Sequence, residues 1–231
     1  MNLSIVLPTF NEKGNIGILV DELVKIIPNN IKKEIIIIDD NSDDGTFLYC
    51  KELFKKNSEV RLILRKSKRS LGASVGEGIK NCSGEKIIVM DTDLNHNPIH
   101  IPELLKLSTS YDVVSCSRYC FGGSMKNKPR FFASYLYNVL LRIILNTDVK
   151  DNTGGYFCIK KEALDQLTFN KIFFGYGEYF FRLLYFLKIK NFKIKEIPTK
   201  YKERIYGHSK SRFLYMIVNY FISAVKLRLG I

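Results

Sequence analysis

The sequence lacks a long uninterrupted apolar run. No stretch approaches the roughly 20 consecutive apolar residues that a membrane-spanning helix needs. The best candidate, residues 213–229, is interrupted by Asn219, Lys226 and Arg228. The first eight residues read as a strand, with neither the basic region nor the cleavage site of a signal peptide. We therefore expect neither a membrane span nor a signal peptide.

Paired cysteines are also missing. The five cysteines are odd in number and contain no CxxC pair; they are Cys50, Cys82, Cys116, Cys120 and Cys158. This pattern favours buried reduced thiols in a cytosolic compartment over disulfides or a metal site. His96 and His100 have helical spacing, but no other His or Cys is placed to complete a zinc site.

Two common nucleotide-binding signatures are absent. The sequence has no P-loop and no GxGxxG, and the glycines between Gly72 and Gly78 open a predicted helix without the dinucleotide spacing. These absences argue against an NAD-dependent enzyme and against a P-loop NTPase.

Acidic residues are scarce relative to basic ones. Asp and Glu number 23 against 36 Lys and Arg, which gives a net charge of +13 over 231 residues. Such an excess favours an anionic partner: nucleic acid, an anionic membrane face or a phosphate-bearing substrate. We find neither an Arg/Lys stripe nor a recognised nucleic-acid motif, so we expect no nucleic acid.

Hydrophobic periodicity predicts an α/β fold with a mostly parallel central sheet and flanking helices. In the first half, strands at 3–8, 34–39, 60–64 and 86–90 alternate with helices at 14–27, 46–56 and 74–81. The second half predicts strands at 113–117, 156–160 and 193–200 and helices at 102–109, 131–145, 162–167, 178–187 and 211–229. Pro198 places the last strand at an edge of the sheet, because proline lacks an N–H. One domain, 1–231, is the simplest organisation.

Polar residues collect where three predicted strands end. Pro8–Glu12 follows the first strand, Asp39–Thr46 the second and Asp91–Pro98 the fourth. Ligands of open parallel sheets bind beyond the carboxyl ends of the strands. Two carboxylates spaced as Asp91 and Asp93 can hold one Mg²⁺ or Mn²⁺, which prefer oxygen ligands and share them with substrate phosphates. The alternative is a solvated acidic turn that caps the next helix.

Other residues allow two interpretations as well. Asp40 either accepts hydrogen bonds from a nucleobase or belongs to the turn before the 46–56 helix. Arg118, directly after a strand, binds phosphate or is a surface charge. Glu178 orients a sugar or caps a helix.

Six segments in order resemble one family. They are Pro8–Glu12, Asp39–Thr46, Lys68–Gly72, Asp91–Pro98, Ser117–Tyr119 and Arg204–Lys210. Together they resemble the family 2 glycosyltransferases of the dolichyl-phosphate mannose synthase type, over residue 3 to about residue 211. The resemblance implies a GT-A (Rossmann-like) fold, GDP-mannose as donor, Mg²⁺ or Mn²⁺ as cofactor, and inversion at the anomeric carbon.

The resemblance also implies residue roles. The nucleotide sugar would be bound by Pro8, Phe10, Glu12, Ile38, Asp40, Asp91, Thr92 and Asp93, with Ile38 and Asp40 facing the base. The metal would be held by Asp91 and Asp93, with Asn95 at a position where the family often has Gln. The acceptor phosphate would be bound by Arg118, Arg130, Ser134, Arg204 and Lys210. Asp93, Arg118, Arg204 and Lys210 would form the catalytic set.

These implications define the expected function. A hexose, mannose from GDP-mannose, would be transferred to dolichyl (polyprenyl) phosphate; residues 1–98 would bind the nucleotide sugar, 99–210 the acceptor, and 211–231 would form an amphipathic helix. The enzyme would be peripheral on the cytoplasmic face of a membrane (the endoplasmic reticulum in a eukaryote), with small membrane-embedded subunits as candidate partners. The alternatives are a UDP-glucose donor with the same acceptor, or transfer to a soluble glycan.

Overall fold

The computed structural model describes residues 2–201 and 213–231. Its main sheet contains β1 (Asn2–Thr9), β2 (Lys32–Asp39), β3 (Val60–Leu64), β4 (Lys86–Val89), β5 (Val113–Ser117), β7 (Phe157–Lys160) and β8 (Ile194–Pro198). The strand order is β3-β2-β1-β4-β7-β5-β8, and β7 alone among these strands runs antiparallel to its neighbours. The predicted α/β class with a mostly parallel sheet is therefore confirmed.

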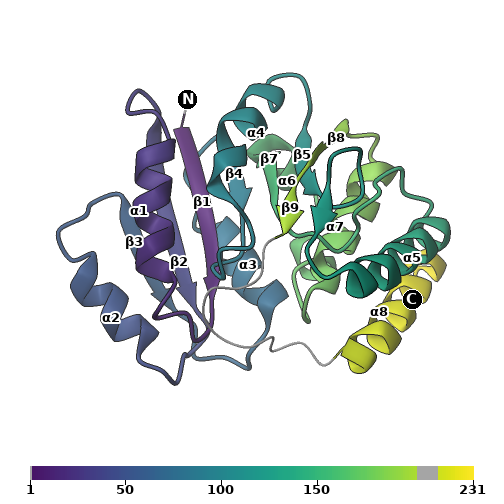
Figure 1. Ribbon diagram of the computed structural model, residues 1–231, viewed down its shortest axis with the longest axis horizontal. Coiled ribbons are helices and arrows are strands. Elements are labelled where there is room, and N and C mark those ends of the chain that lie inside the picture. The colour runs from purple at the N-terminus through teal and green to yellow at the C-terminus, as the bar shows by residue number, and fades with distance from the viewer. Residues whose placement is uncertain (1, 202–212) are drawn as a thin grey trace.

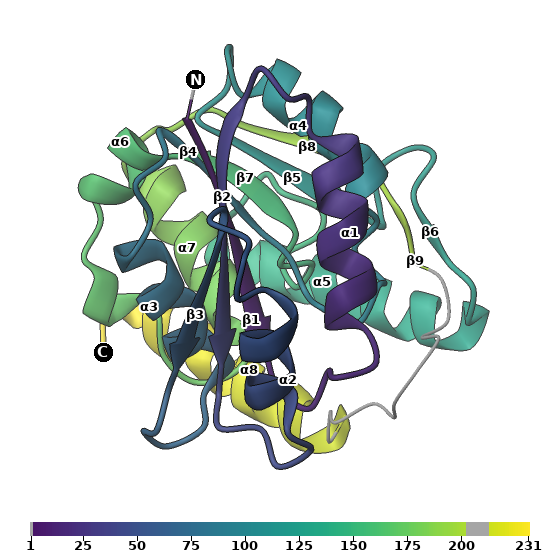
Figure 2. The same ribbon diagram turned by 90° about the vertical axis from the view of Figure 1, so that its left-hand side faces the viewer.

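Helices cover both faces of this sheet, as Figures 1 and 2 show. One face carries α1 (Ile16–Ile26), α2 (Thr46–Leu53) and α4 (Ile101–Leu107); the other carries α3 (Leu71–Lys80), α6 (Lys161–Asp165) and α7 (Glu178–Ile189). Successive residues of β2 show why both faces need cover: Ile35 and Ile37 belong to the first core, and Ile36 and Ile38 to the second. A strand buried on both faces reads as an unbroken apolar run.

The predicted last strand, 193–200, is divided in the structure. β8 lies at the edge of the main sheet, as Pro198 predicts, whereas β9 (Lys200–Tyr201) pairs with β6 (Ser124–Met125) in a separate small sheet. Two short 3-10 helices, Pro98–His100 and Phe169–Lys171, complete the connections. The division turns the chain toward the carboxyl ends of the central strands.

Two further helices pack beside the sheet on α7. They are α5 (Lys128–Leu145) and α8 (Phe213–Leu229), and they share a third core of Leu141, Leu145, Phe181, Tyr220 and Ala224. Asn127 caps α5, its side-chain oxygen accepting from the Arg130 N–H at 3.0 Å. No helix within the described ranges is both long and apolar enough to cross a membrane.

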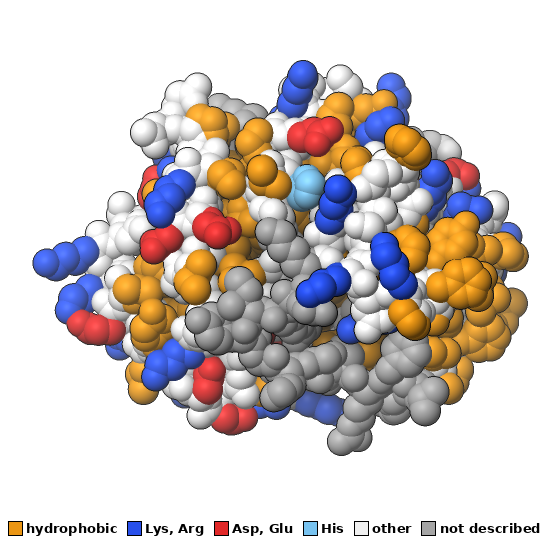
Figure 3. Space-filling model, in the orientation of Figure 1, with side chains coloured by type: hydrophobic (Ala, Val, Ile, Leu, Met, Phe, Trp, Pro, Cys, Tyr) orange, Lys and Arg blue, Asp and Glu red, His pale blue; other side chains and the backbone are white. Residues whose placement is uncertain are grey.

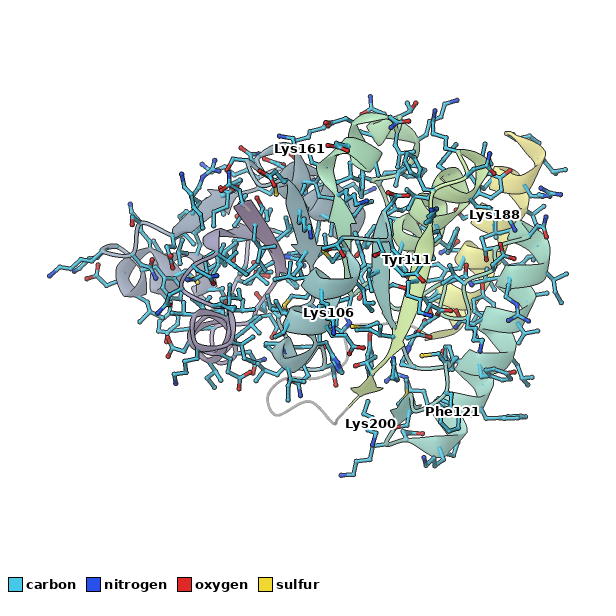
Figure 4. The ribbon with its side chains drawn as sticks, turned by 90° about the horizontal axis from the view of Figure 1, so that it is seen from above. Lys106, Tyr111, Phe121, Lys161, Lys188 and Lys200 are labelled. Carbon is cyan, nitrogen blue, oxygen red and sulfur yellow. The ribbon has the colours of Figure 1, made fainter. Side chains whose placement is uncertain are left out.

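Figure 4 shows the molecule from above the view of Figure 1 and labels Lys106 on α4, Lys161 on α6 and Lys188 on α7. Basic side chains thus stand on the helices of both faces, whereas the carboxylates described below lie where β1, β2 and β4 end.

Close packing of α3 on the sheet gives a first prediction. A methyl group on Gly78 would lie 2.5 Å from Val6 Cγ1 and 2.6 Å from Ile38 Cδ1. We expect Gly78→Ala to lower the free energy of unfolding by about 1–3 kcal/mol, the usual result of overpacking. The matched control is Gly17→Ala in α1, where the new methyl meets only the ends of Tyr49 and Leu53 at 3.2 Å. Equal urea midpoints for the two variants would contradict this account.

Glu34 gives a pH-dependent prediction. Burial alone would raise its pKa, but hydrogen bonds from Ser4, the Ser83 N–H and hydroxyl, and Arg61 outweigh burial and lower the pKa from 4.5 to about 2. A carboxyl whose pKa is depressed on folding stabilises the protein above its unfolded pKa and ceases to do so as the pH falls through its folded pKa. The stability difference between wild type and Glu34→Gln should therefore shrink between about pH 5 and pH 2. Urea unfolding across this range measures it, and a constant difference would refute the assignment.

Candidate active site

A cavity of about 740 Å³ opens where β1, β2 and β4 end. Of the residues predicted to bind a nucleotide sugar, all but one line it: Pro8, Phe10, Glu12, Asp40, Asp91, Thr92 and Asp93. The parallel register of β1 with β2, which places Thr9 beside Asp39, brings these separate segments to one edge. The structure therefore gathers the predicted residues, which lie up to 85 positions apart in the sequence, into one site together with Gly175 and Tyr176.

Ile38 is the exception, and its predicted role needs correction. Its side chain is fully buried and packs in the core beneath α3 with Val6 and Val75. Strand alternation explains this, because Ile38 points to the same face as Ile36. The side chain of Ile38 thus faces a helix and not the cavity.

Hydrogen bonds connect the loop that follows β1 to the loop that follows β2. The Asn11 N–H donates to Ser42 Oγ at 2.9 Å, and the Asp43 N–H donates to Asn11 Oδ1 at 2.8 Å. The Glu12 N–H donates to Thr46 Oγ1 at 3.1 Å, while the Glu12 carboxylate accepts from the Asn15 amide at 2.6 Å. Asn11 has a φ of 53°, in the left-handed region that Asn tolerates. These bonds fix one wall of the cavity.

Asp40 already has partners in the structure. One of its oxygens pairs with the Arg65 guanidinium, and the other accepts from the Ser70 N–H at 2.7 Å. Arg65 also donates to the Lys68 carbonyl at 3.0 Å and lies 3.4 Å from the Glu77 carboxylate. Asp40 therefore anchors the 65–70 loop that borders the cavity, a role beyond the predicted contact with a base.

Arginine side chains line this wall and had no predicted role. Arg65 follows β3 directly, so the rule that directed attention to the ends of the other strands applies to it as well. Arg69 places its guanidinium 3.5 Å from the centre of the Phe10 ring and 3.3 Å from Asp43. A cation stacked on an aromatic ring at a cavity mouth is suited to an anionic or aromatic ligand.

Asp91 and Asp93 occupy the exit of β4 in unequal environments. The side chain of Asp91 is 43% exposed, whereas residue Asp93 is only 6% exposed. Asp93 accepts hydrogen bonds from the N–H and the side-chain amide of Asn95, both at 3.1 Å. Leu94, which lies between Asp93 and Asn95, has a φ of 63°, which is uncommon and costly for a bulky residue. Local backbone strain of this kind clusters at functional sites.

The oxygen atoms of this loop fit a hard divalent cation. Besides the two carboxylates, Asn95 Oδ1 is buried and has no hydrogen-bond partner within residues 2–201 and 213–231. No cluster of three or more His, Cys, Asp or Glu in these ranges is arranged to hold a metal. A cation bound here would therefore complete its coordination with ligand oxygens and water, as Mg²⁺ usually does at phosphate sites.

A second group of polar residues lies at the end of β5. Arg118 donates to both oxygens of Asp151, at 2.8 and 2.6 Å, and to Thr153 Oγ1 at 2.9 Å. Burial by itself lowers the pKa of Arg118, but the Asp151 carboxylate more than offsets this and raises it. Arg118 is 7% exposed and does not line the cavity. In this structure the Asp151 carboxylate compensates the charge of Arg118, and the predicted role of Arg118 on phosphate stays a prediction.

The remaining predicted acceptor residues are distributed over α5 and beyond. Arg130 is exposed in the first turn of α5, and Ser134 accepts a hydrogen bond from the Tyr119 hydroxyl at 2.7 Å. Asn138, one turn further on, accepts from the Asn152 N–H at 2.7 Å and so ties α5 to the Asp151 loop. Arg204 and Lys210 lie outside the described residues.

Comparison with known proteins identifies the family. The model of glycosyl transferase family 2 matches residues 4–168. The chain belongs to glycosyl transferase family 2. The dolichol-phosphate mannosyltransferase of Pyrococcus furiosus is 33% identical over 91% of the chain, which spans 59% of that relative's length. The dolichol-phosphate mannosyltransferase of Mycosarcoma maydis is 29% identical over 98% of the chain and 80% of its own length.

Solved structures share the family 2 fold. The glucosyl-3-phosphoglycerate synthase of Mycobacterium tuberculosis, solved with Mn²⁺, UDP and glucosyl-3-phosphoglycerate, superposes with a TM-score of 0.75 at 19% identity. The alignment covers 100% of this chain and 80% of the synthase. The same synthase with Mg²⁺ and UDP gives a TM-score of 0.74 at 18% identity. The predicted GT-A fold and the predicted membership of family 2 are both confirmed.

The buried pair at the end of β5 gives a prediction for this family 2 chain. We expect Asp151→Asn to lower the free energy of unfolding by about 3–5 kcal/mol, because the Arg118 cation stays buried without its counter-charge. Replacing both partners, Arg118→Met with Asp151→Leu, should recover part of the loss. The control is Asp148→Asn, whose partner Lys188 and own carboxylate are both more exposed; it should cost at most about 1 kcal/mol. Urea unfolding measures all three, and equal losses at Asp151 and Asp148 would contradict the prediction.

Proposed function

We propose that the chain is an inverting, metal-dependent glycosyltransferase that moves mannose from GDP-mannose to dolichyl (polyprenyl) phosphate. The observation that carries the proposal is the pair Asp91 and Asp93 at the exit of β4, inside a cavity rimmed by Arg65 and Arg69. The relatives from Pyrococcus furiosus and Mycosarcoma maydis are named for this type of reaction. The choice of mannose is supported by those names.

The cavity suggests how a nucleotide sugar lies. Phe10 offers a ring face and Asp40 hydrogen-bond acceptors at the end formed by β1 and β2, which suits the nucleoside. Asp91 and Asp93, at the end of the central β4, then lie where the diphosphate would extend. A bound Mg²⁺ or Mn²⁺ would supply neutralisation of the charge that develops on the leaving diphosphate.

The proposed acceptor does not require a strong general base. A phosphate monoester has a second pKa near ~6 and is largely ionised at neutral pH. Its oxygen can attack without losing a proton first, so catalysis depends on alignment and on charge stabilisation. Two anionic substrates repel each other, and Arg130, Arg204 and Lys210 are the residues that we propose to offset this repulsion. Arg118 would support them because its pair with Asp151 fixes the Asp151 loop, which is tied to α5.

The exposed surfaces of α5 and α8 support the proposal of a membrane-facing side. The predicted C-terminal helix buries Tyr220 and Ala224 against the body of the protein yet exposes Phe221 and Ile222 at 44% and 45%. On α5, Phe132, Leu136 and Ile143 are exposed as well. Figure 3 shows hydrophobic side chains gathered beside lysines and arginines on this side of the molecule.

This composition supports a peripheral membrane location. Apolar and aromatic side chains beside basic ones suit the interface of an anionic membrane. We propose that the α5 and α8 side rests on the cytoplasmic face of a membrane, where a polyprenyl phosphate presents its head group. Small membrane-embedded subunits remain part of this proposal as partners.

The decisive test is transfer of labelled mannose from GDP-mannose to dolichyl phosphate in detergent. We expect product that disappears on chelation of divalent cations and returns with Mg²⁺ or Mn²⁺. Asp93→Asn should reduce transfer by at least about 100-fold, the size expected when one group that stabilises transition-state charge is lost. Asp165→Ala, an exposed carboxylate on α6, is the control that should leave transfer unchanged.

The outcomes separate the alternatives. Product from UDP-glucose but not from GDP-mannose would keep the site and replace the donor, an alternative that the UDP-bound synthase structures favour. Transfer to a soluble glycan, with none to any polyprenyl phosphate, would overturn the lipid acceptor. Metal-independent transfer would overturn the role of Asp91 and Asp93.

A further inference from the structure

His96 lies behind the loop of the two carboxylates and has no role in the mechanism above. Its ring is fully buried, and its Nδ1 accepts a 2.8 Å hydrogen bond from the backbone N–H of Asp91. Its Nε2 lies 2.5 Å from the Tyr201 hydroxyl and 3.7 Å from the Asp91 carboxylate. The ring stacks on Tyr156 with a centroid distance of 5.0 Å and an interplanar angle of 15°.

These contacts define which nitrogen carries the proton. A backbone N–H can only donate, so Nδ1 must offer its lone pair to Asp91. The neutral ring then carries its hydrogen on Nε2 and donates it to the Tyr201 oxygen. The Tyr201 hydroxyl in turn donates to the Gly154 carbonyl at 3.1 Å. Each hydrogen bond of this series therefore has one direction: Asp91 donates to His96, His96 donates to Tyr201, and Tyr201 donates to Gly154.

This series of hydrogen bonds connects separate parts of the site. Asp91 is the exposed carboxylate at the exit of β4, and Gly154 belongs to the loop that also supplies Asp151 to Arg118. The face of the Tyr201 ring lies 4.9 Å from the Arg118 guanidinium. The buried His96 imidazole and the half-buried Tyr201 phenol thus join the carboxylate loop to the arginine at the end of β5.

We propose that His96 is a positioning residue for the divalent cation and the nucleotide, held in its Nε2–H tautomer by Tyr201. The inference rests on the proposed function, because it requires that Asp91 takes part in binding the cation. His96 holds the backbone of Asp91, and this bond helps to set the direction of the Asp91 carboxylate, whose side chain is 43% exposed. Leu94, in the same loop, has a strained φ that persists only where surrounding contacts hold the backbone, and the His96 bond is one such contact of this loop.

The test measures Mn²⁺ binding to the full chain with GDP present, by the electron paramagnetic resonance of free Mn²⁺. Tyr201→Phe removes one oxygen and keeps the ring, and we expect it to weaken Mn²⁺ binding roughly 10-fold. His96→Ala should weaken binding by about 10–100-fold. His96→Asn, whose amide oxygen can take the place of Nδ1, should recover part of that loss.

His100→Asn is the matched control. This histidine is also partly buried and contacts the edge of Tyr156 at 6.4 Å, but its Nε2 bonds to Thr199 and not to Tyr201. Its replacement should leave the Mn²⁺ affinity unchanged. Asp91→Asn provides the reference for direct loss of a metal contact.

A second measurement reads the tautomer directly. Long-range ¹H–¹⁵N spectra of the three histidines, assigned with His96→Asn, should show an unprotonated Nδ1 and a protonated Nε2 for His96. In Tyr201→Phe, where Nε2–H loses its acceptor, the His96 signals should shift while those of His100 stay unchanged. A merely structural role would not produce this pattern together with weaker Mn²⁺ binding.

Failure of the positioning role and failure of the proposed function give different results. If Asp91→Asn weakens Mn²⁺ binding but His96→Ala and Tyr201→Phe do not, the positioning role is overturned and the proposed function stands. If His96 carries its proton on Nδ1, the assigned direction of these hydrogen bonds is wrong and the proposed tautomer is overturned. If Asp91→Asn itself leaves binding unchanged, the proposal falls together with the metal site of the proposed function.

Discussion

The gathering of four carboxylates at one edge of the sheet is the constraint on which the rest of this site depends. Asp39, Asp40, Asp91 and Asp93 stand at one edge of the sheet because parallel strands end there together. Each is stabilised differently: Asp40 by Arg65, Asp39 by the Ser42 N–H at 2.8 Å, and Asp93 by Asn95. Asp91, the most exposed, is held through its backbone by His96. The cationic 65–70 loop and the strained turn at Leu94 are arranged around this concentration of negative charge, which is also what makes the edge suitable for a cation.

Much of the fold and part of the site could be predicted because their signals are local. An apolar run such as residues 34–39 predicts a buried strand by itself, and a carboxylate pair directly after a strand predicts where it will lie. The direction of β7 was beyond such reasoning, because a strand of four residues, three of them apolar, carries no information on parallel or antiparallel pairing. Ile38 was misplaced for a simpler reason: residues of β2 alternate between the two faces of the sheet, and Ile38 packs with Ile36 on the face covered by α3.

The pairs that sequence reasoning missed join residues distant in the chain. Arg65 meets Asp40 across 25 positions and Arg118 meets Asp151 across 33. Either arginine, considered alone, is a cation after a strand and suits a phosphate equally well. Only the fold shows that both arginines are engaged in buried pairs, and that Arg65 in addition lines the cavity together with Arg69. The sequence order does not reveal which counter-charge a cation meets.

The antiparallel strand β7 has a consequence for the folding of the protein during its synthesis on the ribosome. β1 to β4 are contiguous in the chain, but the free side of β4 pairs only with β7, after residues 90–156 have been made. At about 5–20 residues per second, that interval lasts several seconds, during which the apolar β4 is an open template for other chains. Protection of the nascent chain by chaperones during this window should therefore matter more for the yield of folded protein than the stability of the finished sheet.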